Sequence, residues 1–186
     1  MSNTLLTLFH VDRYKEYYRT GMWRDDTVYS LVRDHADRTP ERIAVRSRYG
    51  DLTYRQLVDF ADAFAGDLAD HGVVAGQRVA VWLPSRPEGI IALLACSRNG
   101  YVCCPSLHRD HTVGDIIQLL KRMRASAVVA EDGYGADAHR TDLFANLDQV
   151  ETLRRAYRLE KSGPGQGIGI VAGRNDLPPA TARDAN

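Results

Sequence analysis

The sequence predicts an α/β fold in which helices flank a layered, mostly parallel sheet, with a small β-hairpin beside it. The central observation is a short apolar run at residues 78–83 that ends at a proline, followed by a helix over 88–99 and a second apolar run at 101–104. Strand, helix and strand at this spacing form a βαβ unit with parallel strands. A helix over 112–124 and a strand over 127–130 repeat the pattern, which gives three parallel strands.

The central helix is apolar around nearly its whole circumference. Pro87 suits its first turn, where a missing N–H costs nothing, and Gly100 supplies a stop just after Asn99. Residues 89–96 between them are almost all apolar, so neighbouring elements should cover this helix on most sides. We expect the sheet to lie inside the domain.

A helix is also predicted over residues 27–37. Asp25 or Asp26 can cap it, and it ends before Pro40 because the residue preceding a proline avoids helical angles. Its apolar residues fall on one face: Val28, Leu31, Val32, His35 and Ala36.

The next segments predict a hairpin and a long amphipathic helix. Apolar runs at residues 43–45 and 52–54 flank a turn at 50–51. Thr53 with Gln56 three residues later is a capping-box pattern that begins the helix. The apolar stripe of this helix consists of Leu57, Phe60, Ala61, Phe64, Ala65 and Leu68.

The pattern weakens after the strand at 127–130. Residues 131–133 form a turn, and we expect a short helix near 142–147, a strand near 153–159 and a short strand at 168–172.

We divide the chain into an N-terminal arm (1–25), an α/β subdomain (26–172) and a linker or tail (173–186). The favoured interpretation of the arm is a segment packed on the domain, and the alternative is a ligand or partner surface. Both account for three aromatic residues at helical spacing: Tyr14, Tyr17 and Tyr18.

Composition limits the class of protein. The 186 residues are 44% apolar, and 24 Lys and Arg balance 24 Asp and Glu, so no basic field attracts nucleic acid or acidic membranes. Three cysteines do not form a disulfide framework and favour a reducing compartment. No run reaches the roughly 18 apolar residues of a membrane span, and the N-terminus lacks a signal-peptide pattern. We therefore expect a cytoplasmic protein without nucleic-acid partners.

Few residues suggest chemistry by themselves. His108 and His111 have the spacing of a ligand pair, but no further ligand follows at a known spacing, so we predict no metal site. As polar loop residues at the carboxyl edge of a parallel sheet, they could serve general ligand binding. The glycine-rich run at 163–169 lacks the Lys-Ser/Thr ending of a phosphate loop, which favours a flexible loop.

The cysteines and Trp82 are best interpreted as packing residues. Cys96, Cys103 and Cys104 lie in apolar segments, where a thiol packs as a small hydrophobe, and no basic neighbour would activate them. The sequence contains no Gly-x-Ser-x-Gly, no paired catalytic carboxylates and no Walker motif. We assign no catalytic residue.

Four segments in order carry a resemblance. Residues 38–45 read Arg-Thr-Pro-Glu-Arg-Ile-Ala-Val, residues 52–57 read Leu-Thr-Tyr-Arg-Gln-Leu, and residues 76–88 begin Gly-Gln-Arg-Val-Ala-Val. Residues 95–105 run from Ala through Gly-Tyr-Val to Pro. Over about residues 25–135, this order resembles the N-terminal subdomain of the adenylate-forming superfamily, which includes acyl- and aryl-CoA synthetases, luciferases and peptide-synthetase adenylation domains.

The resemblance implies a fragment of a larger enzyme. In such enzymes a carboxylate attacks the α-phosphate of ATP, with Mg²⁺, and a thiol, usually coenzyme A, then takes the acyl group. The family's phosphate loop, ribose-binding Asp and catalytic Lys lie further along than this sequence reaches. We therefore expect no bound cofactor and no activity for this chain alone, an unknown carboxylate substrate, partners in the remaining subdomains, and self-association through exposed apolar surface.

Two alternatives stay open at this stage. One is a self-standing α/β binding or interaction module without catalysis. The other, a small nucleotide-binding enzyme of flavodoxin-like type, is disfavoured because no phosphate-cradling loop follows a strand.

The resemblance also suggests one site residue. In acyl-CoA synthetases, the turn after the strand that matches 127–130 approaches the coenzyme A nucleotide. Arg140 in this turn could bind a phosphate of coenzyme A, although Glu131 and Asp132 oppose it. A solvated turn is the favoured alternative.

Overall fold

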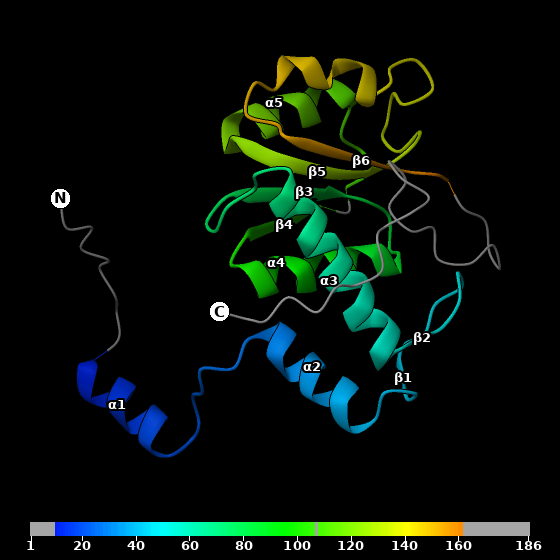
Figure 1. Cartoon of the computed structure of the whole chain (residues 1–186). Helices are drawn as coiled ribbons and strands as arrows, with labels where there is room; N and C mark the ends of the chain where they lie inside the picture. Colours follow the sequence, from blue (N-terminus) through cyan, green and yellow to red (C-terminus); the bar gives the residue numbers. More distant parts are fainter. Residues whose placement is uncertain (1–9, 107, 162–186) are drawn as a thin grey trace.

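The computed structural model describes residues 10–106 and 108–161, and its centre is a four-stranded sheet in the order β4-β3-β5-β6 (Figure 1). Every neighbouring pair is parallel, and Val79 at the centre pairs with Cys103 on one side and Ala127 on the other. The α/β class with a mostly parallel sheet is confirmed. The strands are β3 (Arg78–Trp82), β4 (Val102–Ser106), β5 (Ala125–Glu131) and β6 (Arg155–Leu159).

Helices cover both faces of this sheet. In Figure 1, α3 (Tyr54–Asp70) and α4 (Pro87–Asn99) lie on one face, and α5 (Val113–Met123) lies on the other. Val79 and Val81 of β3 pack toward α3 and α4, whereas Ala80 and Trp82 pack toward α5. Alternate side chains of the central strand therefore contribute to two separate cores, as the period of two in a strand requires.

The ends of α4 follow the sequence signals. Pro87 occupies the first turn, and Gly100 ends the helix in the left-handed conformation at φ 69°. Its outer face, however, is not covered: Ile90 and Leu93 are 42% and 43% exposed. The expectation of cover on most sides is wrong for this face, because the elements that pack against α4, which are α2, α3 and the sheet, leave Ile90 and Leu93 uncovered.

Strand β4 also differs from the fully buried strand we expected. It lies at the edge of the sheet, so Cys103 and Cys104 are only half-buried. It also continues through Pro105 to Ser106. A proline is tolerated there because an edge strand does not need every N–H for pairing.

The predicted helix over 27–37 is α2 (Val28–Arg38), but its cap and face differ from the prediction. Thr27, and not an aspartate, caps it through a reciprocal capping box with Ser30. Val28 and Leu31 are exposed, because a different face of the helix packs against α3. On that face, the Tyr29 hydroxyl donates to Asp62.

The hairpin and the start of α3 are confirmed. β1 (Ile43–Val45) pairs antiparallel with β2 (Leu52–Thr53), and Thr53 and Gln56 form the predicted capping box. The apolar stripe of α3 is buried except for Phe60, which is partly exposed.

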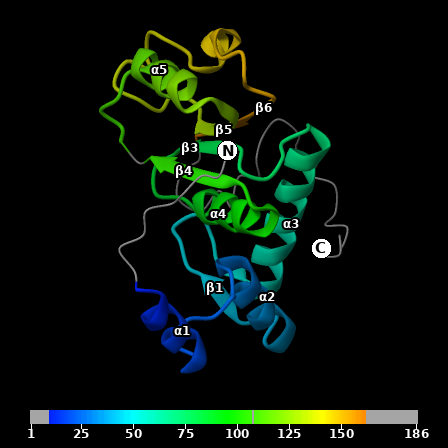
Figure 2. The same ribbon diagram turned by 90° about the vertical axis from the view of Figure 1, so that its left-hand side faces the viewer.

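The N-terminal helix α1 (Val11–Arg19) buries none of its residues, and both views show it away from the sheet (Figure 2). Its aromatic rings pack on their own neighbours instead: Tyr14 lies 5.0 Å from Tyr18 and 5.6 Å from Trp23 between ring centroids. The prediction that this arm packs on the domain is therefore wrong for α1.

Two weakly patterned elements are present near their predicted places. The short helix is the 3-10 helix η1 (Phe144–Gln149), and the strand is β6, which makes a fourth parallel strand. The predicted strand at 168–172 and the glycine-rich run at 163–169 lie outside the described residues. Across the described ranges, no helix combines the length and apolar character needed to cross a bilayer.

Two glycine substitutions test how α4 ends. Gly100→Ala should lower the free energy of unfolding by about 1 kcal/mol, because alanine disfavours the left-handed angle. The matched control is Gly66→Ala inside α3, where an added Cβ meets nothing within 4 Å. This change should raise stability by about 0.5–1 kcal/mol. Urea unfolding measures both, and equal effects would contradict the assignment of Gly100 as the helix stop.

Candidate functional site

The carboxyl edge of the sheet is the first place to look for a site. Central strand β3 has β4 on one side and β5 on the other, and the helices of the two connections lie on opposite faces. In open α/β sheets, ligands bind outside the carboxyl ends of the strands where the connections diverge. Here that place lies between the ends of β3 and β5, and we call it the β3–β5 crevice.

The guanidinium of Arg86 fills the β3–β5 crevice. Its Nη1 donates to Glu131 Oε2 at 2.6 Å and to the carbonyl of Glu160 at 2.9 Å. Its Nε and Nη2 donate to the two carboxylate oxygens of Glu88 at 3.0 and 2.6 Å. The Tyr49 ring from the hairpin lies 5.5 Å from the guanidinium carbon. One side chain thus joins β5, β6, α4 and the hairpin.

This Arg86 cluster is buried. The side chains of Arg86 and Glu88 are 1% exposed, and that of Glu131 is 8% exposed. Burial works to lower the pKa of Arg86, but the hydrogen bonds and charges of Glu88 and Glu131 outweigh it and the pKa is raised. The guanidinium therefore stays cationic, and its donors are directed to protein acceptors rather than to a ligand.

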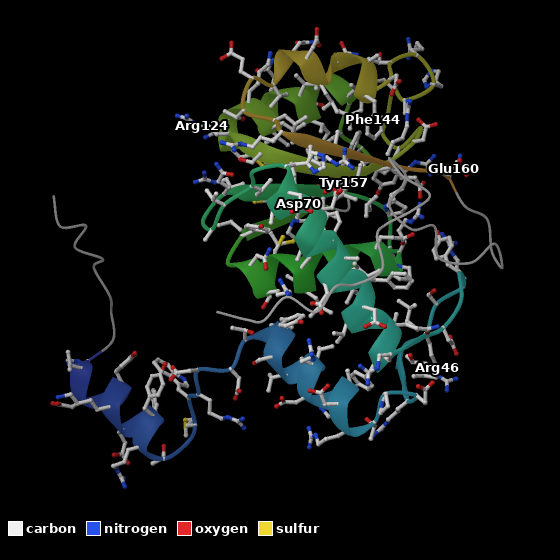
Figure 3. The ribbon with its side chains drawn as sticks, in the orientation of Figure 1. Arg46, Asp70, Arg124, Phe144, Tyr157 and Glu160 are labelled. Atoms are coloured by element: carbon white, nitrogen blue, oxygen red, sulfur yellow. The ribbon has the colours of Figure 1, made fainter. Side chains whose placement is uncertain are left out.

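A hollow of about 310 Å³ lies beside the cluster, between the hairpin and the ends of β3 and β4. Apolar side chains make most of its wall, and Arg46, Ser47 and Ser85 supply polar groups at its border. Arg46 is exposed on the hairpin (Figure 3). The volume is at the lower end for small-molecule sites, which typically hold about 300–1,000 Å³.

A second hollow of about 320 Å³ lies beyond the end of β5. Its wall is more polar and includes Asp132, Asp142, Phe144 and Lys161. Arg158 from β6 pairs with Asp132 at 3.1 Å and with Asp142 at 2.6 Å, so both carboxylates are partly neutralised.

The structure places Arg140 outside both hollows. It is exposed, and its Nε donates to Nε2 of His139 at 3.0 Å. The two carboxylates that we expected to oppose an anion here are engaged elsewhere, Glu131 by Arg86 and Asp132 by Arg158. The negative charge near Arg140 therefore repels a phosphate less than the sequence suggested. The role of Arg140 stays a prediction.

The structure brings His108 and His111 together without making a metal centre. Their ring centroids are 5.4 Å apart in an edge-to-face arrangement. The carbonyl of His108 accepts the indole N–H of Trp82 at 3.0 Å, and Trp82 itself is buried as predicted. Within 10–106 and 108–161, no group of three or more His, Cys, Asp or Glu residues is arranged to hold a metal.

Sequence reasoning missed the buried charges. No role was assigned to Glu88 on α4 or to Asp62 and Asp67 on α3, all three of which are buried. Asp67 accepts from the Tyr157 hydroxyl at 2.6 Å and from Arg155 Nε at 3.0 Å, which ties α3 to β6. Burial, and then the bond to Asp67, raise the pKa of Tyr157. The available signal was a charged residue at the start or on the inner face of an otherwise apolar helix.

The family of the chain follows from comparison with known proteins. The sequence model of the family described as AMP-binding enzyme matches residues 32–179. The chain belongs to the AMP-binding enzyme family. The resemblance to the N-terminal subdomain of adenylate-forming enzymes is thereby confirmed.

Individual relatives agree with this family. A salicylyl-CoA synthase / salicylate adenylyltransferase from a Streptomyces species is 33% identical over 130 residues, which are 69% of this chain and 22% of that protein. A medium-chain fatty-acid–CoA ligase from Escherichia coli is 32% identical over 166 residues, 88% of this chain and 29% of that protein. The chain thus spans only about a fifth to a third of these relatives.

A solved structure shares the fold. The protein from Rhodopseudomonas palustris described as a long-chain-fatty-acid CoA ligase superposes with a TM-score of 0.64 at 27% identity. The match covers 77% of this chain and 35% of that protein.

Substitution of Arg86 tests the cluster. Arg86→Met should lower the free energy of unfolding by about 3–5 kcal/mol, because it leaves two buried carboxylates without a counter-charge. Arg46→Met on the nearby hairpin is the control and should change it by less than about 0.5 kcal/mol. Chemical denaturation measures both, and similar small losses for the two variants would show that the Arg86 cluster is not structurally required.

Proposed function

We propose that the chain is the N-terminal part of an ATP-dependent acid–thiol ligase that forms an acyl-adenylate and transfers the acyl group to a thiol. The observation that carries this proposal is the family match over residues 32–179, together with relatives that are named as CoA ligases and adenylating enzymes. ATP, Mg²⁺ and coenzyme A are the cofactors of the full-length enzyme in this proposal. The carboxylate comes from the acyl or aryl acids.

We further propose that the described subdomain does not catalyse adenylation alone. Attack on the α-phosphate requires oriented donors and cations around the developing negative charge. Arg86, the cation at the β3–β5 crevice, directs its donors to Glu88, Glu131 and the Glu160 carbonyl. The edge where a ligand is expected is thus used for structure, and other subdomains would supply the reacting site.

Exposed apolar surface on α4 supports the proposal that other subdomains pack against this one. Ile90 and Leu93 are 42% and 43% exposed, and because they are three residues apart on α4 they lie on one face of this helix. Contiguous apolar surface of this type marks an interface. In the proposal the remaining subdomains cover it, and the isolated chain self-associates through it.

An activity assay tests the first proposal. The purified chain with ATP, Mg²⁺ and a panel of acids should release pyrophosphate at the rate of the blank, because Arg86, the cation at the described sheet edge, directs its donors to protein acceptors. The panel includes salicylate and medium-chain fatty acids, and the E. coli medium-chain ligase is the positive control. Acid-dependent turnover above the blank would refute the proposed inactivity.

Arg140 is tested in the full-length enzyme. Arg140→Ala should weaken coenzyme A binding about tenfold or more, because a charge-assisted hydrogen bond to phosphate contributes about 1.5–3 kcal/mol. Arg140→Lys, which keeps the positive charge, should lose less. Calorimetric titration with coenzyme A and with its dephospho form measures the effect, and an affinity for coenzyme A unchanged in the alanine variant would end the assignment.

A further inference from the structure

Two of the three cysteines meet between α4 and β4. Cys96 lies in the last turns of α4 and is buried, while Cys103 and Cys104 follow each other in β4 and are half-buried. After the turn at Gly100, the chain comes back against the helix, and the N–H of Tyr101 donates to the carbonyl of Cys96 at 2.9 Å. In both views α4 lies alongside β4 (Figures 1 and 2).

The alternation of the strand decides which cysteine faces Cys96. Cys103 lies two residues beyond Tyr101 and therefore on the same face of the chain, toward α4. Both Tyr101 and Cys103 pack with the apolar cluster that contains Cys96. Cys104 points to the opposite face, and its thiol contacts the carbonyl of Val102 at 3.7 Å. Cys96 and Cys103 are thus a pair, although Cys103 and Cys104 are adjacent in the sequence.

The two sulfurs differ in character. Interaction with the Cys96 thiol lowers the pKa of Cys103 in spite of its burial, while interaction with Cys103, together with burial, raises the pKa of Cys96. Cys103 is also the more accessible of the two, because β4 is an edge strand. A more accessible and more acidic thiol beside a buried one is the arrangement in which oxidation of the first is resolved by the second.

We propose that Cys96 and Cys103 form a reversible disulfide when the chain meets a mild peroxide oxidant. The Cys103 thiolate attacks one oxygen of hydrogen peroxide, the O–O bond breaks, and sulfenic acid and hydroxide form. The Cys96 sulfur then attacks the Cys103 sulfur, its proton combines with the departing hydroxyl, and water leaves. Two thiols and one peroxide become one disulfide and two waters, and a dithiol reductant restores the pair.

This bond would tie the end of α4 to the start of β4. Helix α4 carries Ile90 and Leu93, the exposed apolar residues at which we propose that the remaining subdomains dock, so oxidation would alter the element that presents this surface. The link to docking rests on the proposed function, whereas formation of the disulfide does not. Acid-dependent pyrophosphate release would refute the proposed inactivity, whereas absence of the disulfide would refute the present proposal. The two results are therefore independent.

Thiol counting and peptide mapping test the proposal on the full chain. After hydrogen peroxide treatment, alkylation under denaturing conditions should find one free thiol instead of the three of the reduced chain, and dithiothreitol should restore three. Mapping should recover a peptide in which Cys96 is linked to Cys103. The wild-type map decides the question even if a variant fails to fold.

Two variants supply the controls. Cys104→Ser should still form the disulfide and fall from two free thiols to none. Cys96→Ala should form none, and dimedone should trap sulfenic acid at Cys103. A link from Cys103 to Cys104, a link from Cys96 to Cys104, disulfide-bonded dimers or an unchanged thiol count would each overturn the proposal.

Discussion

The guanidinium of Arg86 is the interaction on which the arrangement of the sheet edge depends. Desolvating a cation is costly, and the cost is offset only if each of its nitrogens finds an acceptor. Arg86 meets this condition with acceptors from three places in the chain: Glu88 two residues away, Glu131 at the end of β5 and the Glu160 carbonyl after β6. The positions of these elements are therefore coupled, because moving any one leaves buried charge unpaired.

Two further buried carboxylates join the layers in the same way. Asp62 on α3 accepts from the Tyr29 hydroxyl of α2 at 2.5 Å and lies 2.8 Å from Arg98 Nε of α4. Asp67, one and a half turns further along α3, binds Arg155 and Tyr157 of β6. Apolar burial alone is non-directional, whereas these pairs fix how the helices sit against each other and the sheet.

Local signals made most of the fold predictable, because they act within a few residues. Pro87 and Gly100 set the bounds of α4, and the Thr53–Gln56 capping box set the start of α3. The site was less predictable because its contacts join residues far apart in the chain, such as Arg86 and Glu131. The edge position of β4 was missed for a similar reason: an apolar run indicates a strand, but the strand order decides whether one or two neighbours cover it.

The distribution of charge and apolar surface fits the proposal that other subdomains supply the reacting site. A sheet edge that binds phosphate by itself would present cations and free donors to solvent and cover its apolar residues. The described residues show the reverse: the central cation is buried among carboxylates, while Ile90 and Leu93 stay exposed on α4. A rigid, internally paired edge beside an uncovered apolar face suits a supporting wall for other subdomains, because its geometry does not depend on a bound ligand.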